Sequence, residues 1–490
     1  MGRLRVYALH SSSAFCRTIQ LSRTKITFAR EDYFACNLLM EIPMLPATKS
    51  SNTVGIDDIF RLSWPIMIGM FAQTFMGIFD VLIVADRGTT AIAAMALAVP
   101  WSFMPLLMIE GVLRGAQVLA AQRMGAEDRA GAETLLWPTL RLSLLIGIPI
   151  ALLGLTFPAI ALWGLDSPEL AKLAGWHVAI RLLGTPLRGI FVGMMGWLRG
   201  MGNPRTAMIA QLSANVTYVV LGAALVRGWG PFPEWGVLGT AISSVISWVI
   251  GAAAVLWAVR RELRRNAPLG NAPEVWAIGA IGFPLGMQHL FDVAGFAVFS
   301  LVLVSTGEAH LAAHMMAARI ISVSFLPGYA IGEAAGVLVG NAIGAKDSAR
   351  ARQSWALATR VAIAIMMFWA VCFALFPNAL IAPFNAAFEV NLIAHDLLWI
   401  AAAFQLLDAV ATVALGALVG AGDTRFTLVL NLLVGWGAKI PLGVFLAVVL
   451  HLGAQGVWLG FVLEIGLLAA IAVWRIRQHP QFRALEPAIA

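Results

Sequence analysis

The sequence predicts an all-α integral membrane protein, with twelve transmembrane helices in two six-helix bundles. Three observations carry this prediction: an apolar composition, twelve long apolar segments, and a second half that repeats the first. Of the 490 residues, 60% are hydrophobic and 12% are charged, whereas a soluble domain has about 25% charged residues. This composition cannot cover a water-facing surface, so we expect most of the chain to lie in lipid.

Polar, Gly-rich or Pro-rich breaks divide the chain into twelve apolar segments. Each segment reaches the ~20 residues that a helix needs to cross a bilayer. We predict helices because the segments lack the alternating pattern of a transmembrane barrel. The predicted spans are about 58–86, 90–122, 134–163, 168–200, 205–227, 235–260, 275–305, 309–342, 350–377, 391–420, 425–450 and 454–474.

Basic residues between these segments indicate the topology. With both termini in the cytoplasm, inner loops hold twelve Lys and Arg residues and outer loops hold three, as the positive-inside rule requires. The formal net charge of +7 follows from these loops, so no nucleic-acid partner is predicted. The inner residues are Arg123, Arg129, Arg199, Arg205, Arg260, Arg261, Arg264, Arg265, Lys346, Arg350, Arg352 and Arg425, and the outer ones are Arg87, Lys172 and Arg227.

The second half of the chain repeats the first at an offset of 219 or 220 residues. Because six spans are an even number, both copies enter the membrane from the same side, and a parallel pseudo-two-fold axis relates the bundles. Secondary transporters with such repeats place the substrate path between the halves. The matching motifs are Trp64-Pro65 with Phe283-Pro284, Gly125 to Asp128 with Gly344 to Asp347, Gly200 to Arg205 with Gly420 to Arg425, and Gly236-Val237 with Gly456-Val457.

The repeat and the basic loops predict five parts of the chain. Residues 1–56 read as a disordered or misassigned N-terminal extension, with Met40 or Met44 as the alternative start and a targeting leader as a further alternative. The six-helix lobes are expected at 57–260 and 275–475. A basic cytoplasmic linker at 261–274 joins them, and a cytoplasmic tail follows at 476–490. We expect the basic residues of the linker to fix the topology of the chain, or alternatively to bind anionic lipid.

Several motifs occur in an order and spacing that resemble one transporter family. Pro65 precedes Asp80 by fifteen residues, Asp292 precedes an Ala-Ala-His at 312–314, and Asp408 stands twelve residues before Gly420-Ala-Gly-Asp. Together with Gly-Pro-Phe-Pro-Glu at 230–234, they resemble the multidrug and toxic compound extrusion (MATE) family, NorM-like branch, over about residues 57 to 475.

This resemblance implies a secondary active antiporter in the plasma (bacterial inner) membrane, multi-pass and with both termini cytoplasmic. It implies export of amphipathic, often cationic, organic compounds in exchange for H⁺ or Na⁺ by alternating access. The alternative is a lipid-linked precursor flippase or a metabolite exporter of the same superfamily. We expect a monomer whose partners are its small-molecule substrate, H⁺ or Na⁺, and membrane lipid.

Three aspartates lie inside predicted spans: Asp80, Asp292 and Asp408. An ionised, unpaired carboxylate in mid-membrane is costly, so each is a candidate carrier of the coupling ion. The alternative is a carboxylate held by local polar groups. The resemblance places Asp292 and Asp408 in one cavity of the C-terminal lobe and ranks them above Asp80. Candidate secondary ligands are Asn215, Thr240 and Ser244 for Asp80, and Gln288 and His289 for Asp292.

Two departures from the family favour H⁺ over Na⁺. Tyr218 and Gly222 stand where helix five offers polar partners to the first aspartate, and Phe404 stands where some members have Tyr. Na⁺ prefers several oxygen ligands, and these changes remove them. We therefore expect Asp80 to have lost its helix-five partners.

A second group of residues is expected to line the substrate cavity. Aromatic and Met side chains stack on flat apolar cations, although packing in the core is the alternative for each. Arg188 occupies the position in the first repeat that Asp408 holds in the second, and its alternative role is an ion pair with Glu110 or Asp80. The cavity candidates are Phe291, Phe404, Gln405, Met315 and Arg188.

The sequence lacks the motifs of common membrane enzymes. It contains no Gly-x-x-x-x-Gly-Lys, His-Glu-x-x-His or Gly-x-Ser-x-Gly, which would indicate phosphate binding, zinc or a serine nucleophile. The three cysteines have no metal or redox spacing. We expect no enzymatic activity, no cofactor and no metal beyond the coupling ion.

Overall fold

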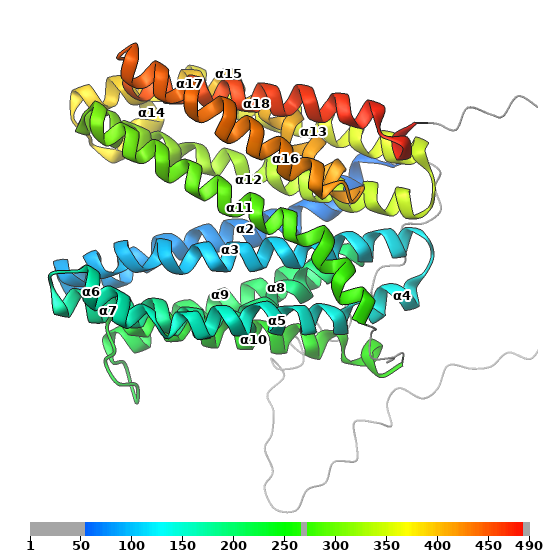
Figure 1. The fold of residues 1–490 in the computed structure, drawn as a ribbon, viewed down its shortest axis with the longest axis horizontal. Helices are drawn as coiled ribbons and strands as arrows, with labels where there is room; N and C mark the ends of the chain where they lie inside the picture. The colour runs from blue at the N-terminus through cyan, green and yellow to red at the C-terminus, as the bar shows by residue number, and fades with distance from the viewer. Residues whose placement is uncertain (1–53, 266–271, 484–490) are drawn as a thin grey trace, which may run out of the picture. The chain divides into compact units, whose positions relative to one another are not determined.

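The computed structural model describes residues 54–265 and 272–483, which fall within one compact unit, Leu45–Ala490. These residues form helices and short loops, and none of them is in a strand (Figure 1). Within these ranges, eleven helices are long and apolar enough to cross a membrane. The number rises to twelve if one bent pair of helices is counted as a single span. The predicted spans are therefore confirmed as helices.

The N-terminal bundle contains six spans. The third is α5 with α6, and the fourth is α7 with α8, which bend by 48° at their junction. Pro186 stands in the first turn of α8, where a missing N–H interrupts the preceding helix. The elements are α2 (Ile56–Val84), η1 (Ala85–Arg87), α3 (Thr89–Gly125), α4 (Arg129–Thr134), α5 (Leu136–Gly154), α6 (Phe157–Gly164), α7 (Pro168–Leu183), α8 (Thr185–Gly200), α9 (Pro204–Arg227) and α10 (Val237–Arg265).

The C-terminal bundle repeats this pattern with two local differences, the first being that its fourth span is the single helix α15 in place of a bent pair. Its fifth span contains two π-helical turns, η3 and η4, a feature that often accompanies functional sites. The elements are α11 (Ala272–Thr306), α12 (Glu308–Gly344), α13 (Ser348–Leu375), α14 (Pro377–Ile381), η2 (Ala382–Phe384), α15 (Phe388–Gly420), α16 (Thr424–Val434), η3 (Gly435–Lys439), α17 (Ile440–Val444), η4 (Phe445–Val449), α18 (Gly453–Gln478) and η5 (Pro480–Phe482).

The equivalent helices α3 and α12 contact each other at equivalent residues. A Cβ on Gly125 would collide with the carbonyl oxygen of Asn341, and a Cβ on Gly344 would collide with that of Gln122. Both glycines and both partners are 219 apart (344 − 125 and 341 − 122). A reciprocal contact of this kind marks a two-fold axis, so the duplication read from the sequence has a spatial counterpart here.

The first helix of each repeat begins against the opposite bundle. Ile59 and Leu62 of α2 pack with residues of α12 and α13. In the same way, Ile278 of α11 packs into the core of the N-terminal bundle, and Arg123 Nη1 pairs with Glu274 Oε1 at 2.8 Å. This crossing of α2 and α11, visible in Figure 1, joins the two lobes at one end of the molecule.

Two predicted boundaries differ from the structure. Residues 260–265 continue α10 instead of forming a loop, because Arg, Glu and Leu all favour helix; residues 266–271 lie outside the described residues. The tail expected from 476 is ordered as far as 483, where buried Ile476 and Phe482 join the C-terminal core. Residues 1–53 of the expected N-terminal extension lie outside the described residues.

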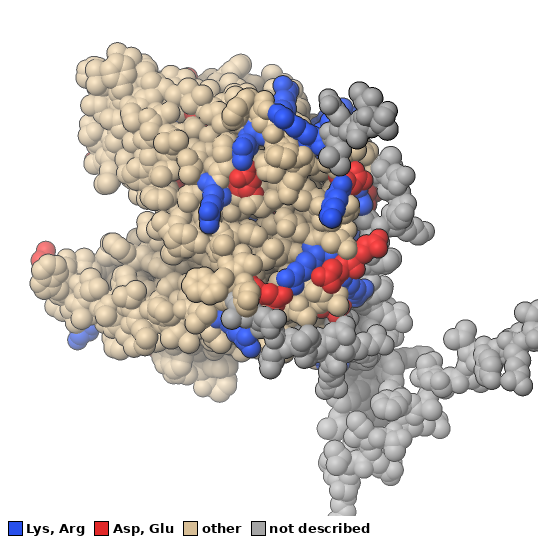
Figure 2. Space-filling view, turned by 45° about the vertical axis from the view of Figure 1, so that its right-hand side comes forward, with Lys and Arg blue, Asp and Glu red and all other residues tan. Residues whose placement is uncertain are grey.

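Charge and apolar surface are distributed as a membrane protein requires. Large apolar side chains such as Leu145 and Phe368 are exposed, as expected for contact with lipid. Figure 2 shows several Lys and Arg side chains on the face formed by the ends of the helices, and a hollow between the two bundles.

Labelling of paired loop positions tests the parallel repeat. Ala126 and Ala345 are equivalent (345 − 126 = 219) and exposed just after α3 and α12. With all native cysteines replaced by Ser, Ala126→Cys and Ala345→Cys should both resist an impermeant maleimide on intact cells and react after permeabilisation. Ala387→Cys, just before α15, should react on intact cells. Labelling of only one of the paired positions would contradict a parallel repeat.

Candidate functional site

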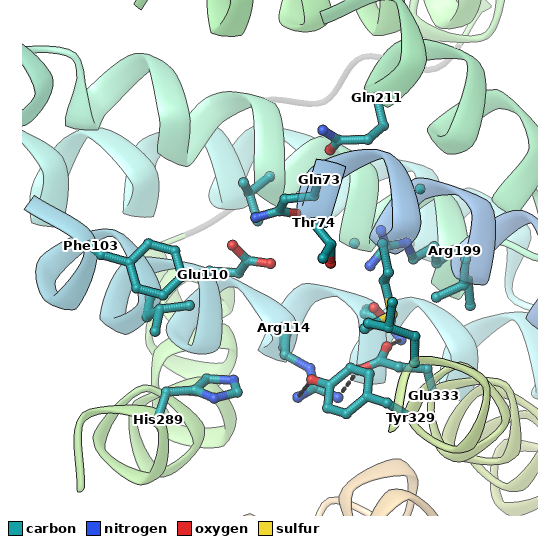
Figure 3. Close-up of a pocket in the computed structure, with 18 of the residues that line it drawn as sticks. Gln73, Thr74, Phe103, Glu110, Arg114, Arg199, Gln211, His289, Tyr329 and Glu333 are labelled. Carbon is teal, nitrogen blue, oxygen red and sulfur yellow. Dashed lines mark hydrogen bonds and ion pairs between the residues drawn. The ribbon is translucent and has the colours of Figure 1, made fainter. Parts of the chain in front are cut away.

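A cavity of about 520 Å³ lies where the two bundles face each other. Side chains from α2, α3, α8, α9, α11 and α12 line it, and Figure 3 shows Glu110, Arg114 and Arg199 entering it from α3 and α8. Its lining combines apolar side chains with amides, hydroxyls and charges. The apolar residues include Ile66, Met70, Val99, Phe103, Leu107 and Leu326.

A buried ion pair occupies the wall of this cavity on the pseudo-two-fold axis. Arg114 Nη2 donates to Glu333 Oε1, and the two residues are 219 positions apart. Arg114 Nη1 donates to the Tyr329 hydroxyl at 3.0 Å, and Gln117 Nε2 donates to Glu333 Oε2 at 2.8 Å. A charged pair at equivalent positions of a duplicated chain joins the two lobes directly.

Asp80 faces a side cavity of about 140 Å³ in the N-terminal bundle. The hydroxyl of Tyr218 donates to Asp80 Oδ1. The expectation that Asp80 has lost its helix-five partners is therefore wrong, because the Tyr218 phenol on α9 is itself a polar partner. Arg181 lines the same cavity and lies within electrostatic reach of Asp80.

Arg188 also lines the side cavity, and it is paired. Its Nη2 lies 2.9 Å from Glu110 Oε2, and its guanidinium lies over the ring of Trp248 at 5.7 Å. The ion pair with Glu110, one of the partners that the sequence allowed, is confirmed, and a role of Arg188 in substrate binding stays a prediction.

The predicted secondary ligands of Asp80 separate in space. Asn215 and Ser244 line the side cavity with Asp80, and Asn215 Oδ1 accepts from Gln211 Nε2 at 2.8 Å. Thr240 instead donates to the carbonyl of Val237 at 2.8 Å, so its hydroxyl is engaged within α10.

Asp292 lines a third cavity of about 210 Å³, on the C-terminal side of the central pair. Gln288, His289 and Thr412 line it as well. Asp408 does not line this cavity, so the expectation that both aspartates face one cavity is wrong for this structure. Thr412, which does line it, donates from Oγ1 to Asp408 Oδ1 at 3.4 Å.

A buried Lys439–Glu464 pair completes the acidic group of the C-terminal bundle. Lys439 Nζ lies 2.8 Å from Glu464 Oε1, and both side chains are buried. Lys439 also lies 5.2 Å from the centre of the Phe461 ring. Glu464 lies within electrostatic reach of both Asp292 and Asp408, and Lys439 lies within electrostatic reach of Asp292.

The other predicted cavity residues lie mainly in packed positions. Phe404 is 3% exposed and stacks on Phe325 in the C-terminal core. Gln405 is buried and donates to Ser324 Oγ at 2.7 Å. Phe291 makes an edge contact with Trp436, and Met315 is exposed.

Six charged residues of these sites were not predicted from the sequence as site residues: Arg114, Arg181, Glu333, Lys439, Glu464 and Arg199. The first five lie inside predicted spans, and a charge there is a functional-site candidate by default. Counting all intramembrane charges, and not only aspartates, would have found them. Arg199 was assigned to an inner loop, whereas its side chain reaches the cavity.

The chain matches the sequence model of the MatE family twice, over residues 65–224 and 284–445. The two matches begin 219 residues apart (284 − 65), in agreement with the repeat. It is 31% identical to a probable multidrug resistance protein NorM of Deinococcus radiodurans, covering 88% of this chain and 97% of that protein. It is 30% identical to the multidrug resistance protein NorM of Burkholderia vietnamiensis, covering 85% and 93%.

Solved structures show the same fold. A MOP superfamily transporter from Pyrococcus furiosus superposes with a TM-score of 0.79 at 23% identity, covering 87% of this chain and 96% of that one. An outward-facing multidrug resistance MATE family transporter superposes with a TM-score of 0.78 at 24% identity, with the same coverage.

Proposed function

This chain belongs to the MATE family of multidrug efflux transporters, and from that premise we propose that it is an antiporter that exports amphipathic organic compounds in exchange for H⁺. The exchange runs by alternating access, in which two rigid lobes rock about the substrate cavity between them. The protein is a multi-pass membrane protein, and we place it in the bacterial inner membrane with both termini in the cytoplasm, as its basic loops favour.

One observation carries the coupling proposal: within the described residues of the C-terminal bundle, neither Asp292 nor Asp408 has an ion pair. Lys439, which lies within electrostatic reach of Asp292, pairs with Glu464 instead. Removing an ionised carboxylate from water without a partner is costly. Both aspartates must therefore take up H⁺ or another cation when the surrounding helices close on them.

The surroundings of Asp408 favour H⁺ over Na⁺. Na⁺ binds best where several oxygen atoms converge, and the hydrogen-bond partner of Asp408 is the hydroxyl of Thr412. The neighbouring Phe404 is packed among aromatic rings. The Lys439 ammonium group already pairs with Glu464. Glu464 is therefore not free to attract Na⁺.

The 520 Å³ cavity and the cavity of Asp292 share part of their lining, which supports a link between the proposed substrate and ion sites. Arg114, His289, Tyr329 and Glu333 line both the 520 Å³ cavity and the cavity of Asp292. A change of charge at Asp292 therefore acts on the same central cluster that the substrate faces. This gives a physical route by which proton binding alters substrate binding.

Transport under separately imposed gradients tests the coupling. Purified protein in proteoliposomes should move rhodamine B or its ethyl ester when a pH gradient is imposed without Na⁺. A Na⁺ gradient at equal pH on both sides should not drive transport, because H⁺ is the coupling ion. Transport that requires Na⁺ while the pH gradient is maintained would contradict proton coupling.

A further inference from the structure

The central cavity between the bundles and the side cavity of the N-terminal bundle together carry more arginines than carboxylates. The 520 Å³ and 140 Å³ cavities share Gln73, Phe103, Glu110 and other lining residues, so they adjoin each other. Among the described residues, four arginines and three carboxylates line the two cavities. They are Arg114, Arg181, Arg188 and Arg199, and Asp80, Glu110 and Glu333.

Two of these arginines are neutralised by fixed partners. Arg114 pairs with Glu333, and Arg188 pairs with Glu110. Each of these carboxylates is therefore engaged and does not offer a free negative charge to a ligand.

The other two arginines are not neutralised in this way. Within residues 54–265 and 272–483, the Arg199 side chain has no ion pair or hydrogen bond, and it lines the larger cavity, where Glu110 lies within its electrostatic reach. The Arg181 Nε atom is buried and has no hydrogen-bond partner in the same ranges. Asp80, the one remaining carboxylate, accepts a hydrogen bond from Tyr218.

We propose that the 520 Å³ cavity binds amphipathic compounds that carry an acidic group, and that Arg199 binds that group. The inference rests on the proposed export function and names the substrate class of the same cavity. The sequence led us to expect substrates that are often cationic, whereas a surplus of arginine favours a ligand with a carboxylate or sulfonate. Guanidinium binds such groups through two parallel hydrogen bonds.

The rest of the cavity suits such a ligand. Its volume of about 520 Å³ lies within the range of ~300–1,000 Å³ that is usual for drug-sized molecules. Thr74, Gln73 and Gln211 offer hydroxyl and amide groups, and Phe103 with Leu107 offers an apolar surface for an aromatic body. Figure 3 shows Thr74 and Arg199 on the same side of the cavity, away from Phe103.

A pair of dyes that differ only in the acidic group tests the inference. Rhodamine B has a free carboxylate, and its ethyl ester lacks that negative charge. Fluorescence anisotropy with purified full-length protein at constant detergent should show tighter binding of rhodamine B by about tenfold, which is the effect of one charge-assisted hydrogen bond. Equal affinity, or tighter binding of the ester, would overturn the inference.

Variants of two arginines on neighbouring helices test whether the preference for rhodamine B arises in the cavity. Arg199→Gln should weaken rhodamine B binding by about tenfold and leave ester binding unchanged, so the ester also reports that the variant is folded. Arg199→Lys should keep part of the preference because the positive charge remains. Arg205→Gln makes the same charge change at an exposed residue of α9, and should alter neither affinity.

Persistence of the full preference in Arg199→Gln would overturn the role of Arg199. Gradient-driven transport of either dye is measured separately, in the proteoliposome experiment described above. Transport of the ester with no preference for the acid would reject this inference and leave the export function standing. Preference in binding with no transport of either dye would reject the export function instead.

Discussion

Asp408→Asn should abolish gradient-driven export while the protein still folds and still binds its substrate. The amide has nearly the same shape as a protonated carboxyl group, but it cannot release or take up H⁺. The half-buried Asp408 keeps its position on α15 beside Thr412, so the amide can accept the same hydrogen bond. Dye transport in proteoliposomes under a pH gradient should fall to the rate of protein-free liposomes.

A matched variant on the same helix controls for folding and expression. Asp396 is also on α15, but its side chain is 59% exposed. Asp396→Asn should transport at the wild-type rate. Asp292→Asn should resemble Asp408→Asn, because Asp292 shares the neighbour Glu464, and Asp80→Asn should be milder. Full transport by Asp408→Asn together with no transport by Asp80→Asn would move the coupling site to the N-terminal lobe.

Glu333→Gln should destabilise the protein strongly, because it leaves the Arg114 guanidinium without its ion pair. The Glu333 side chain is 4% exposed and that of Arg114 is 19% exposed. Removing one partner of a buried ion pair typically costs about 3–5 kcal/mol. We expect a clear fall in the midpoint of thermal unfolding of the purified protein, accompanied by a loss of transport.

The symmetry of the pair supplies a rescue experiment. Because residues 114 and 333 are equivalent positions, the double variant Arg114→Glu with Glu333→Arg reverses the pair across the axis. It should recover much of the thermal stability that either single variant loses. As a control, Glu234→Gln breaks a pair with Arg87 whose carboxylate is 57% exposed, and it should cost less than about 1 kcal/mol. A double variant no more stable than the single variants would contradict a direct pair on the axis.

Membrane insertion, the number of helices and the duplication could all be predicted from the sequence. Each depends on local properties: the length of an apolar run decides whether a helix spans the bilayer, and repeated motifs such as Gly125 to Asp128 are visible by comparison alone. Asp292 and Asp408 could be singled out for the same reason, since a carboxylate inside an apolar run is costly wherever the helix faces. The family resemblance rested on the order of these local features.

The tertiary structure decided which side of each helix faces a cavity. In a soluble helix the polar face marks the surface, but in a membrane both the lipid-facing and the packed faces are apolar. Phe404 was therefore expected in the cavity and instead lies in the core. Arg199 was assigned to a loop, and its side chain lines the cavity.

The tertiary structure also decided the partners of the charges. Arg188 and Glu110 are 78 residues apart, and Lys439 and Glu464 lie on different helices of the C-terminal bundle. Arg114 and Glu333 meet because α3 and α12 pack on the axis that relates the repeats. Charge pairing in lipid depends on distances of a few ångströms between helices, and those distances are set by packing across the whole bundle, which no local stretch of sequence contains.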